Sequence, residues 1–213
     1  MEFRLVYRGA LASQGGGGKG GGLLKEKHRI RRQLHPQFKE LWQSRWHLKR
    51  QIDHRYLKEK TEGGVEIMDY APSGSEAQMT ANKFKEGTFR FLPLITRTNG
   101  LACKLDILFL RRDDPGNLIR SGGGDLDNRV KTLFDALSVP KNGQMEGMNP
   151  EGGEDPLFCL LEDDCLITDV SITTDRLLVP QENDEHVNDV VLILSVTAKV
   201  IDANAAEFEW LSQ

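Results

Sequence analysis

The order of strand-like and helix-like segments constrains the fold of this chain more than any other feature. β-Branched, aromatic and other apolar residues recur in five segments with strand patterns, at residues 2–8, 88–96, 101–110, 166–178 and 189–201. Between the third and the fourth, an amphipathic helix is predicted over residues 125–137, with apolar residues at i, i+3, i+4 and i+7: Val130, Leu133, Phe134 and Leu137. Asn99-Gly100 favours a hairpin turn between two of the strands. These elements predict an α+β fold with a small mixed or antiparallel sheet flanked by helices.

A second, strongly basic helical segment is predicted over residues 23–60. Pro36 is suited to the first turn of its second helix. Apolar residues follow at helical spacing: Phe38, Leu41, Trp42, Leu48 and Ile52. Residues 25–60 contain twelve Lys or Arg against four acids, a net charge of +8, so the remainder carries −12 of the total of −4. A face of this segment can therefore meet a polyanion although the whole chain is acidic.

The length of 213 residues fits one large domain. We expect a single domain over 1–213, with a basic helical insertion (23–60), a flexible connection (61–82), a core (86–202) and a C-terminal tail (203–213). The longest apolar stretch, 190–194, is far shorter than the roughly 20 residues that cross a bilayer. The first residues lack the pattern of a secretory signal, which favours a cytoplasmic location.

Several residue groups receive a structural interpretation. Cys103, Cys159 and Cys165 form no Cys-x-x-Cys pair and are expected to be buried or spare thiols. The glycine tract 15–22 lacks the Ser or Thr after Lys19, and the first Gly, of a phosphate-binding loop, so a flexible loop is expected. The scattered histidines 28, 35, 47 and 54 are not expected to bind metal. Core packing is expected for the aromatic residues Trp42, Trp46 and Tyr56.

The candidate chemistry lies in a set of acids near the 125–137 helix. Asp125 and Asp127 stand where a glycine-rich loop turns into the helix, and Asp163-Asp164 precede a strand. Capping of the helix explains one aspartate, and acid-rich helix starts are common. Several like charges converging on one place are better explained by a divalent cation such as Mg²⁺. Lys131 lies one turn after Asp127 and can stabilise negative charge on a phosphate.

These residues resemble the signature of the RusA family of Holliday junction resolvases. The resemblance rests on residues 125–131 (DLDNRVK), residues 134–137 (FDAL) and Asp163-Asp164 with Ile167 and Asp169 after them, and it extends over about residues 100–200 in the order of elements. It implies a homodimeric α+β endonuclease of DNA recombination and repair. Such an enzyme cuts four-way DNA junctions with Mg²⁺, for which Mn²⁺ can substitute, and leaves 5′-phosphate and 3′-hydroxyl ends.

Carried over to this sequence, the resemblance implies a specific set of site residues. The three essential aspartates fall on Asp125, Asp127 and Asp164, as catalytic residues and metal ligands, and the catalytic lysine falls on Lys131. Asp163 would support them as a neighbour. The chain departs from the family pattern in the long loop at 140–156 and in the segment after the first strand, 9–14. These departures leave open a protein that binds branched DNA without cutting it, and the residues do not distinguish junctions from flaps as substrate.

DNA binding is expected to depend on basic residues, since neutralising phosphates releases counterions and supplies sequence-independent affinity. The basic segment contains the main candidates, and a second group precedes the aspartates. The expected DNA-binding residues are Arg29, Arg31, Arg32, Arg45, Lys49, Arg50, Arg111, Arg112 and Arg120.

Overall fold

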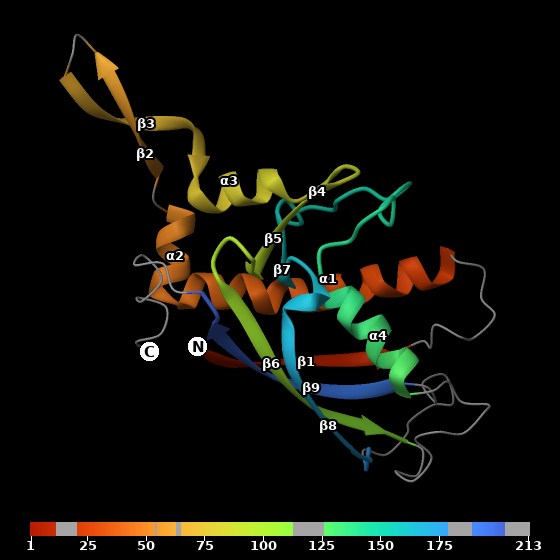
Figure 1. The fold of residues 1–213 in the computed structure, drawn as a ribbon. Coiled ribbons are helices and arrows are strands. Elements are labelled where there is room, and N and C mark those ends of the chain that lie inside the picture. Colours follow the sequence, from red (N-terminus) through yellow and green to blue (C-terminus); the bar gives the residue numbers. More distant parts are fainter. Residues whose placement is uncertain (12–20, 54, 63–64, 113–125, 179–188, 203–213) are drawn as a thin grey trace.

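The computed structural model describes residues 1–11, 21–53, 55–62, 65–112, 126–178 and 189–202, with the backbone alone for 55–62 and 65–74. The glycine tract up to residue 20 and the tail 203–213 lie outside the described residues. The chain mixes helices and strands, which confirms the α+β class (Figure 1). Its elements are β1 (Glu2–Ala10), α1 (Gly21–Ser44), α2 (Trp46–Asp53), β2 (Arg55–Glu62), β3 (Val65–Ser75), α3 (Glu76–Lys83), β4 (Lys85–Glu86), β5 (Phe89–Ile95), β6 (Leu101–Arg111), α4 (Leu126–Leu137), β7 (Leu157–Leu161), η1 (Asp164–Leu166), β8 (Ile167–Arg176) and β9 (Asp189–Val200).

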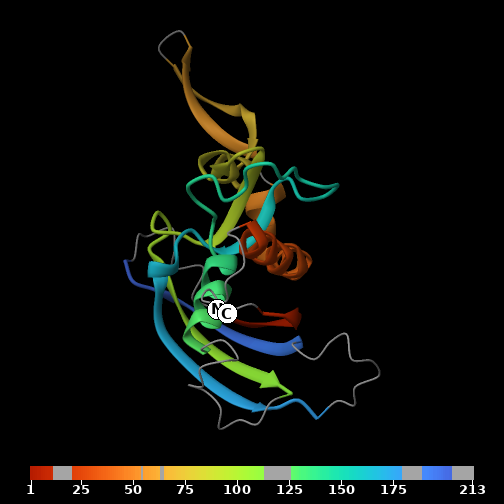
Figure 2. The ribbon, with the colours of Figure 1, turned by 90° about the vertical axis from the view of Figure 1, so that its right-hand side faces the viewer.

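The main sheet has four strands in the order β1-β9-β6-β8. β9 runs antiparallel to both β1 and β6, whereas β8 runs parallel to β6, so the sheet is mixed as predicted. Buried residues alternate with partly exposed ones along β9, because successive side chains of a strand point to opposite faces. The buried face of the sheet packs into one apolar core with α1 and α4, which lie on the same side of it (Figure 2).

A smaller sheet, in the order β4-β5-β7, corrects the predicted hairpin. The turn itself forms: the Leu101 N–H donates to the Thr96 carbonyl at 3.3 Å, and Gly100 has a φ of 60°. However, β5 then pairs in parallel with β7, while β6 enters the main sheet. Every residue of β5 except Arg90 is buried, so this strand is covered on both faces, unlike a hairpin strand with one solvated face. The sequence predicted no strand at β7.

The segment after α2 also differs from the prediction. The helix ends at Asp53. Residues 55–62 and 65–75, expected as helix and flexible connection, form the antiparallel ribbon β2–β3, which projects from the rest of the molecule (Figure 1). α3 follows because Ser75 caps it, with its hydroxyl accepting from the Gln78 N–H and the Gln78 side chain accepting from the Ser75 N–H. The expected connection 61–82 is therefore mostly regular structure.

Pro36 lies inside α1, where the sequence placed a helix start. A proline in a helix interior removes one backbone hydrogen bond and usually kinks or ends the helix. Here Leu34 and Phe38 on either side are each only 1% exposed, and their burial stabilises the helix enough for it to continue past the proline. The stripe that contains Phe38, Trp42 and Leu48 is buried as predicted. In the described part of the chain, no helix is long and apolar enough to span a membrane.

The loop 140–156 has no helix or strand, as predicted, but it packs closely against the rest of the fold. The side chain of Met145 is buried, and the Thr88 hydroxyl donates to the Met148 carbonyl at 3.2 Å. The His35 ring fixes the end of the loop, since Nε2 contacts the Gly153 carbonyl at 3.0 Å and Nδ1 accepts from the Phe158 N–H. Arg32 pairs with two acids of the loop, Glu151 and Glu154.

The buried His28 of α1 predicts a loss of stability in acid. Burial lowers its pKa from 6.5 to about 4, with help from Arg32 and against the effect of Glu154. Between these values the unfolded chain binds a proton that the native chain does not. The unfolding free energy should therefore fall by about 2 kcal/mol between roughly pH 7 and pH 4.5. Urea titrations at each pH measure it, and His28→Leu should flatten the profile by that amount; identical profiles would contradict the prediction.

Candidate functional site

The first part of the candidate site is the exposed face of α4. The apolar stripe of this helix faces the core, with Leu133 and Leu137 each 1% exposed, so Asp127 and Lys131 face solvent. Their side chains are each 60% exposed, and the Asp127 Oδ2 lies 3.3 Å from the Lys131 Nζ. Asp127 is in the first turn, where the helix dipole favours a carboxylate. The predicted spacing of one helical turn thus brings this acid and base together.

The second part is the Asp163-Asp164 pair between β7 and β8. Asp163 caps the short helix η1, its Oδ1 accepting from the Cys165 N–H at 3.0 Å, and it forms an ion pair with Lys141 of the 140–156 loop. The hydrogen bond from Lys141 holds the pKa of Asp163 well below its usual range. Asp163 is therefore engaged in structural contacts, which suits a supporting role.

The neighbouring Asp164 is in a different electrostatic state. Several effects raise the pKa of Asp164. The largest is partial burial of its carboxyl, and the hydrogen bond and charge of Asp163 and the charge of Asp135 come next. The charge of Lys141 lowers the pKa. The negative charges of Asp163 and Asp135 thus make ionisation of Asp164 less favourable. A cation bound here would relieve that repulsion.

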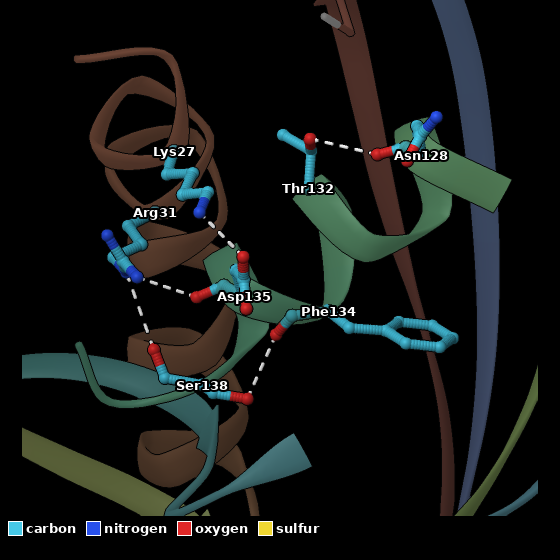
Figure 3. Close-up of polar contacts among 7 residues, drawn as sticks. All are labelled: Lys27, Arg31, Asn128, Thr132, Phe134, Asp135 and Ser138. Carbon is cyan, nitrogen blue, oxygen red and sulfur yellow. Dashed lines mark hydrogen bonds and ion pairs between the residues drawn. The ribbon is translucent and has the colours of Figure 1, made fainter. Parts of the chain in front are cut away.

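Asp135 was part of the sequence signature, but no role was predicted for it. It lies eight residues after Asp127 and four after Lys131, so all three share one face of α4. Its Oδ2 accepts from the Lys27 Nζ at 2.6 Å, and the Lys27 side chain is only 8% exposed (Figure 3). The i, i+4, i+8 spacing placed Asp135 on the helix face of Asp127 and Lys131, but its proximity to Asp164 arises only in the folded chain.

The structure brings together some of the predicted residues and leaves others apart. Asp163 and Asp164 lie near the end of α4 that carries Asp135, whereas Asp127 and Lys131 lie in the N-terminal half of the helix. At 1.5 Å per residue, Asp127 is about 12 Å and Lys131 about 6 Å from Asp135 along the helix axis. Among the described residues, no three His, Cys, Asp or Glu side chains lie close enough to hold one metal ion. Asp125 lies outside the described residues, so the three-aspartate site stays a prediction.

The expected DNA-binding residues fall into three groups. Three of them make contacts within the fold: Arg29 pairs with Glu26, Arg32 pairs with the 140–156 loop, and Arg31 is buried beneath α4. Three others are exposed at the junction of α1 and α2: Arg45, Lys49 and Arg50. Arg111 is 8% exposed, Arg112 is half-buried, and Arg120 lies outside the described residues.

Arg31 acts on the C-terminal end of α4. Its Nη2 donates to the Asp135 carbonyl at 2.6 Å and its Nε to the Ser138 carbonyl at 3.4 Å, so a cation satisfies carbonyls at the negative end of the helix dipole (Figure 3). Burial lowers its pKa to about 10, and the guanidinium stays charged at neutral pH. Lys27 and Arg31 together therefore fix the end of α4 that lies beside Asp164.

The aromatic and thiol predictions are partly confirmed. Trp42 is buried and meets the Phe158 ring edge-on, whereas Trp46 is exposed, so the core packing predicted for Trp46 is wrong. The side chain of Tyr56 lies outside the described residues. The three cysteines are free thiols, and burial raises the pKa of Cys103 and of Cys159 to about 12.

Comparison of the chain with protein-family models, with curated proteins and with solved structures found no match. The functional assignment therefore depends on the residues of the site and on their arrangement.

Proposed function

We propose that the chain is a Mg²⁺-dependent endodeoxyribonuclease of the RusA type. Acting as a cytoplasmic homodimer, it would resolve Holliday junctions or related branched DNA by paired phosphodiester hydrolysis, leaving 5′-phosphate and 3′-hydroxyl ends, in DNA recombination and repair. A two-fold enzyme suits symmetric incision of a two-fold junction. The observation that carries the proposal is the exposed Asp127–Lys131 pair on α4, which presents the signature to solvent while the apolar stripe of the same helix is buried.

The donor chemistry of the proposed site suits a hard divalent ion. Asp125, Asp127 and Asp164 would hold Mg²⁺ through carboxylate oxygens, the ligands that this ion prefers. When bound, Mg²⁺ supplies a more acidic water and neutralises charge on a phosphate. Lys131, a compact point charge one turn from Asp127, can bind a phosphate oxygen and stabilise the charge that develops there. Lys27 and Lys141 hold the neighbouring acids Asp135 and Asp163 in place.

A protein of this type that binds branched DNA without cutting it is the second candidate. One observation favours it. The 140–156 loop, which lengthens the spacer between Asp127 and Asp164, is tied to Asp163 through Lys141. In this case the acidic residues would stabilise the fold and would not bind a catalytic metal ion.

Incision of synthetic four-way junctions discriminates between the two candidates. The full-length chain is incubated with a labelled junction, a flap or a linear duplex, in Mg²⁺, Mn²⁺ or EDTA. We expect paired nicks at opposed positions of the junction in Mg²⁺ or Mn²⁺, ligatable afterwards, and none in EDTA. Junction binding without incision in either metal would support the second candidate. Preferred cutting of the flap would identify flaps, and not four-way junctions, as the substrate. A chain that neither binds nor cuts any of these substrates would contradict both candidates.

A further inference from the structure

We propose that Trp46 is a stacking platform for an unpaired DNA base, within a basic patch formed by Arg45, Trp46, Lys49 and Arg50. This inference deepens the proposed function and rests on it, because branched DNA is the substrate that presents unpaired or unstacked bases beside duplex arms. The patch lies at the junction of α1 and α2, and α2 leads from there to the projecting β2–β3 ribbon (Figure 1).

The break between α1 and α2 exposes the indole. Trp42, one turn earlier, is 2% exposed, and a straight helix would keep Trp46 near the same buried face. The helical hydrogen bonds continue through the break, from the Arg45 N–H to the Leu41 carbonyl at 3.1 Å and from the Lys49 N–H to the Arg45 carbonyl at 2.8 Å. The chain nevertheless bends at Arg45, and Trp46 is 59% exposed. More than half of a large apolar side chain thus contributes no burial to the fold.

Positive charge surrounds the exposed ring. The Arg50 guanidinium carbon lies 5.5 Å from the centre of the Trp46 ring, and the His47 ring meets the indole edge-on at 4.9 Å. Arg45 and Lys49 are exposed, and no described carboxylate pairs with either. Residues 41–52 contain no acid. The guanidinium and the imidazole hold the indole in place, while the other two cations can contact phosphates.

This arrangement fits an unpaired nucleotide better than a duplex or a protein partner. Proteins that bind single strands combine cations along the backbone with aromatic rings on which bases stack. A paired base inside a duplex presents no free face to an indole. A contiguous exposed apolar patch is a common mark of a protein interface. Within the described chain, by contrast, the other exposed large apolar residues, Val6, Val170, Leu178 and Ile201, lie on or beyond strands of the main sheet, not on α1 or α2.

The test measures binding of an unpaired strand without cleavage. In EDTA, the full-length chain is titrated with a labelled oligothymidylate of about 16 nucleotides and, separately, with a blunt duplex. Trp46→Ala should weaken oligothymidylate binding by about tenfold and leave duplex binding almost unchanged. Trp46→Phe, which keeps an aromatic face, should retain most of the affinity. Binding should also quench tryptophan fluorescence in the native chain and in Trp42→Phe, but much less in Trp46→Phe.

The outcomes separate this inference from the proposed function. Equal oligothymidylate affinity of the native chain and Trp46→Ala, or no binding by the native chain, would overturn the platform, even if the enzyme cuts junctions. Trp46-dependent binding by a chain that cuts no junction in Mg²⁺ would support the platform and contradict the nuclease. Thermal melts of both Trp46 variants confirm that a loss of binding does not come from unfolding.

Discussion

Replacing Asp127 by Asn should lower the rate of junction incision by at least about a hundredfold. This loss is larger than the one usually seen when a residue that only orients a metal ligand is replaced. The substitution keeps the size and polarity of the side chain and removes the charge that would bind Mg²⁺. Because Asp127 is 60% exposed and, among the described residues, pairs only with Lys131 of its own helix, the fold should not change. Junction binding should be intact or stronger, since one repulsive charge near the phosphates is lost. Rates are measured on labelled four-way junctions at saturating enzyme.

Glu76 provides a matched control for this variant. It is also an exposed acid in the first turn of a helix, α3, but that helix carries no part of the signature. Glu76→Gln therefore removes the same favourable interaction with a helix dipole, usually about 0.3 to 1 kcal/mol, without touching the proposed site. Full incision by Glu76→Gln with none by Asp127→Asn would assign the loss to the site. Full activity of Asp127→Asn would remove Asp127 from it.

Local periodicity explains how much of the fold could be predicted. The i, i+3, i+4, i+7 stripe of α4 and the alternation in β1, β6 and β9 each report on a face that packs against the core, and the structure confirms these elements. The residue pattern of a strand does not show which other strand it pairs with. The turn after Thr96 forms as Asn99-Gly100 predicted, but the buried residues of β5 and β7 pair with each other over a separation that no local pattern reveals.

The candidate site was predictable to the same extent. The spacing of Asp127 and Lys131 on a helix predicted their contact, because residues four apart lie on one face. The neighbours of Asp164 were not predictable in this way. Asp135 and Lys141 come from a helix and a loop that meet it only in the folded chain. A run of basic residues also does not reveal which of its members are buried: Arg31 and Arg45 both belong to the basic segment, yet only Arg31 is internal.

Arg31→Met should lower the unfolding free energy by about 3 kcal/mol, a substantial part of the 5 to 15 kcal/mol typical of a domain. Methionine fills much of the space of the aliphatic stem, but it leaves the carbonyls of Asp135 and Ser138 without their charged donor. Relief of the buried charge offsets only part of this loss, because the guanidinium satisfies carbonyls at the negative end of a helix dipole. Urea titration measures the change, and the melting temperature should fall by roughly 6 to 10 °C.

Arg45→Met is the matched control, since it removes the same side chain from an exposed position and should leave stability within about 0.5 kcal/mol of the native value. Arg31→Lys should fall between the two, because an ammonium keeps the charge but cannot bridge two carbonyls as a planar guanidinium does. If Arg31→Met and Arg45→Met are equally stable, Arg31 does not hold the end of α4. If only Arg31→Met is destabilised, its incision rate should fall as well, because the same end of α4 places Asp135 beside Asp164.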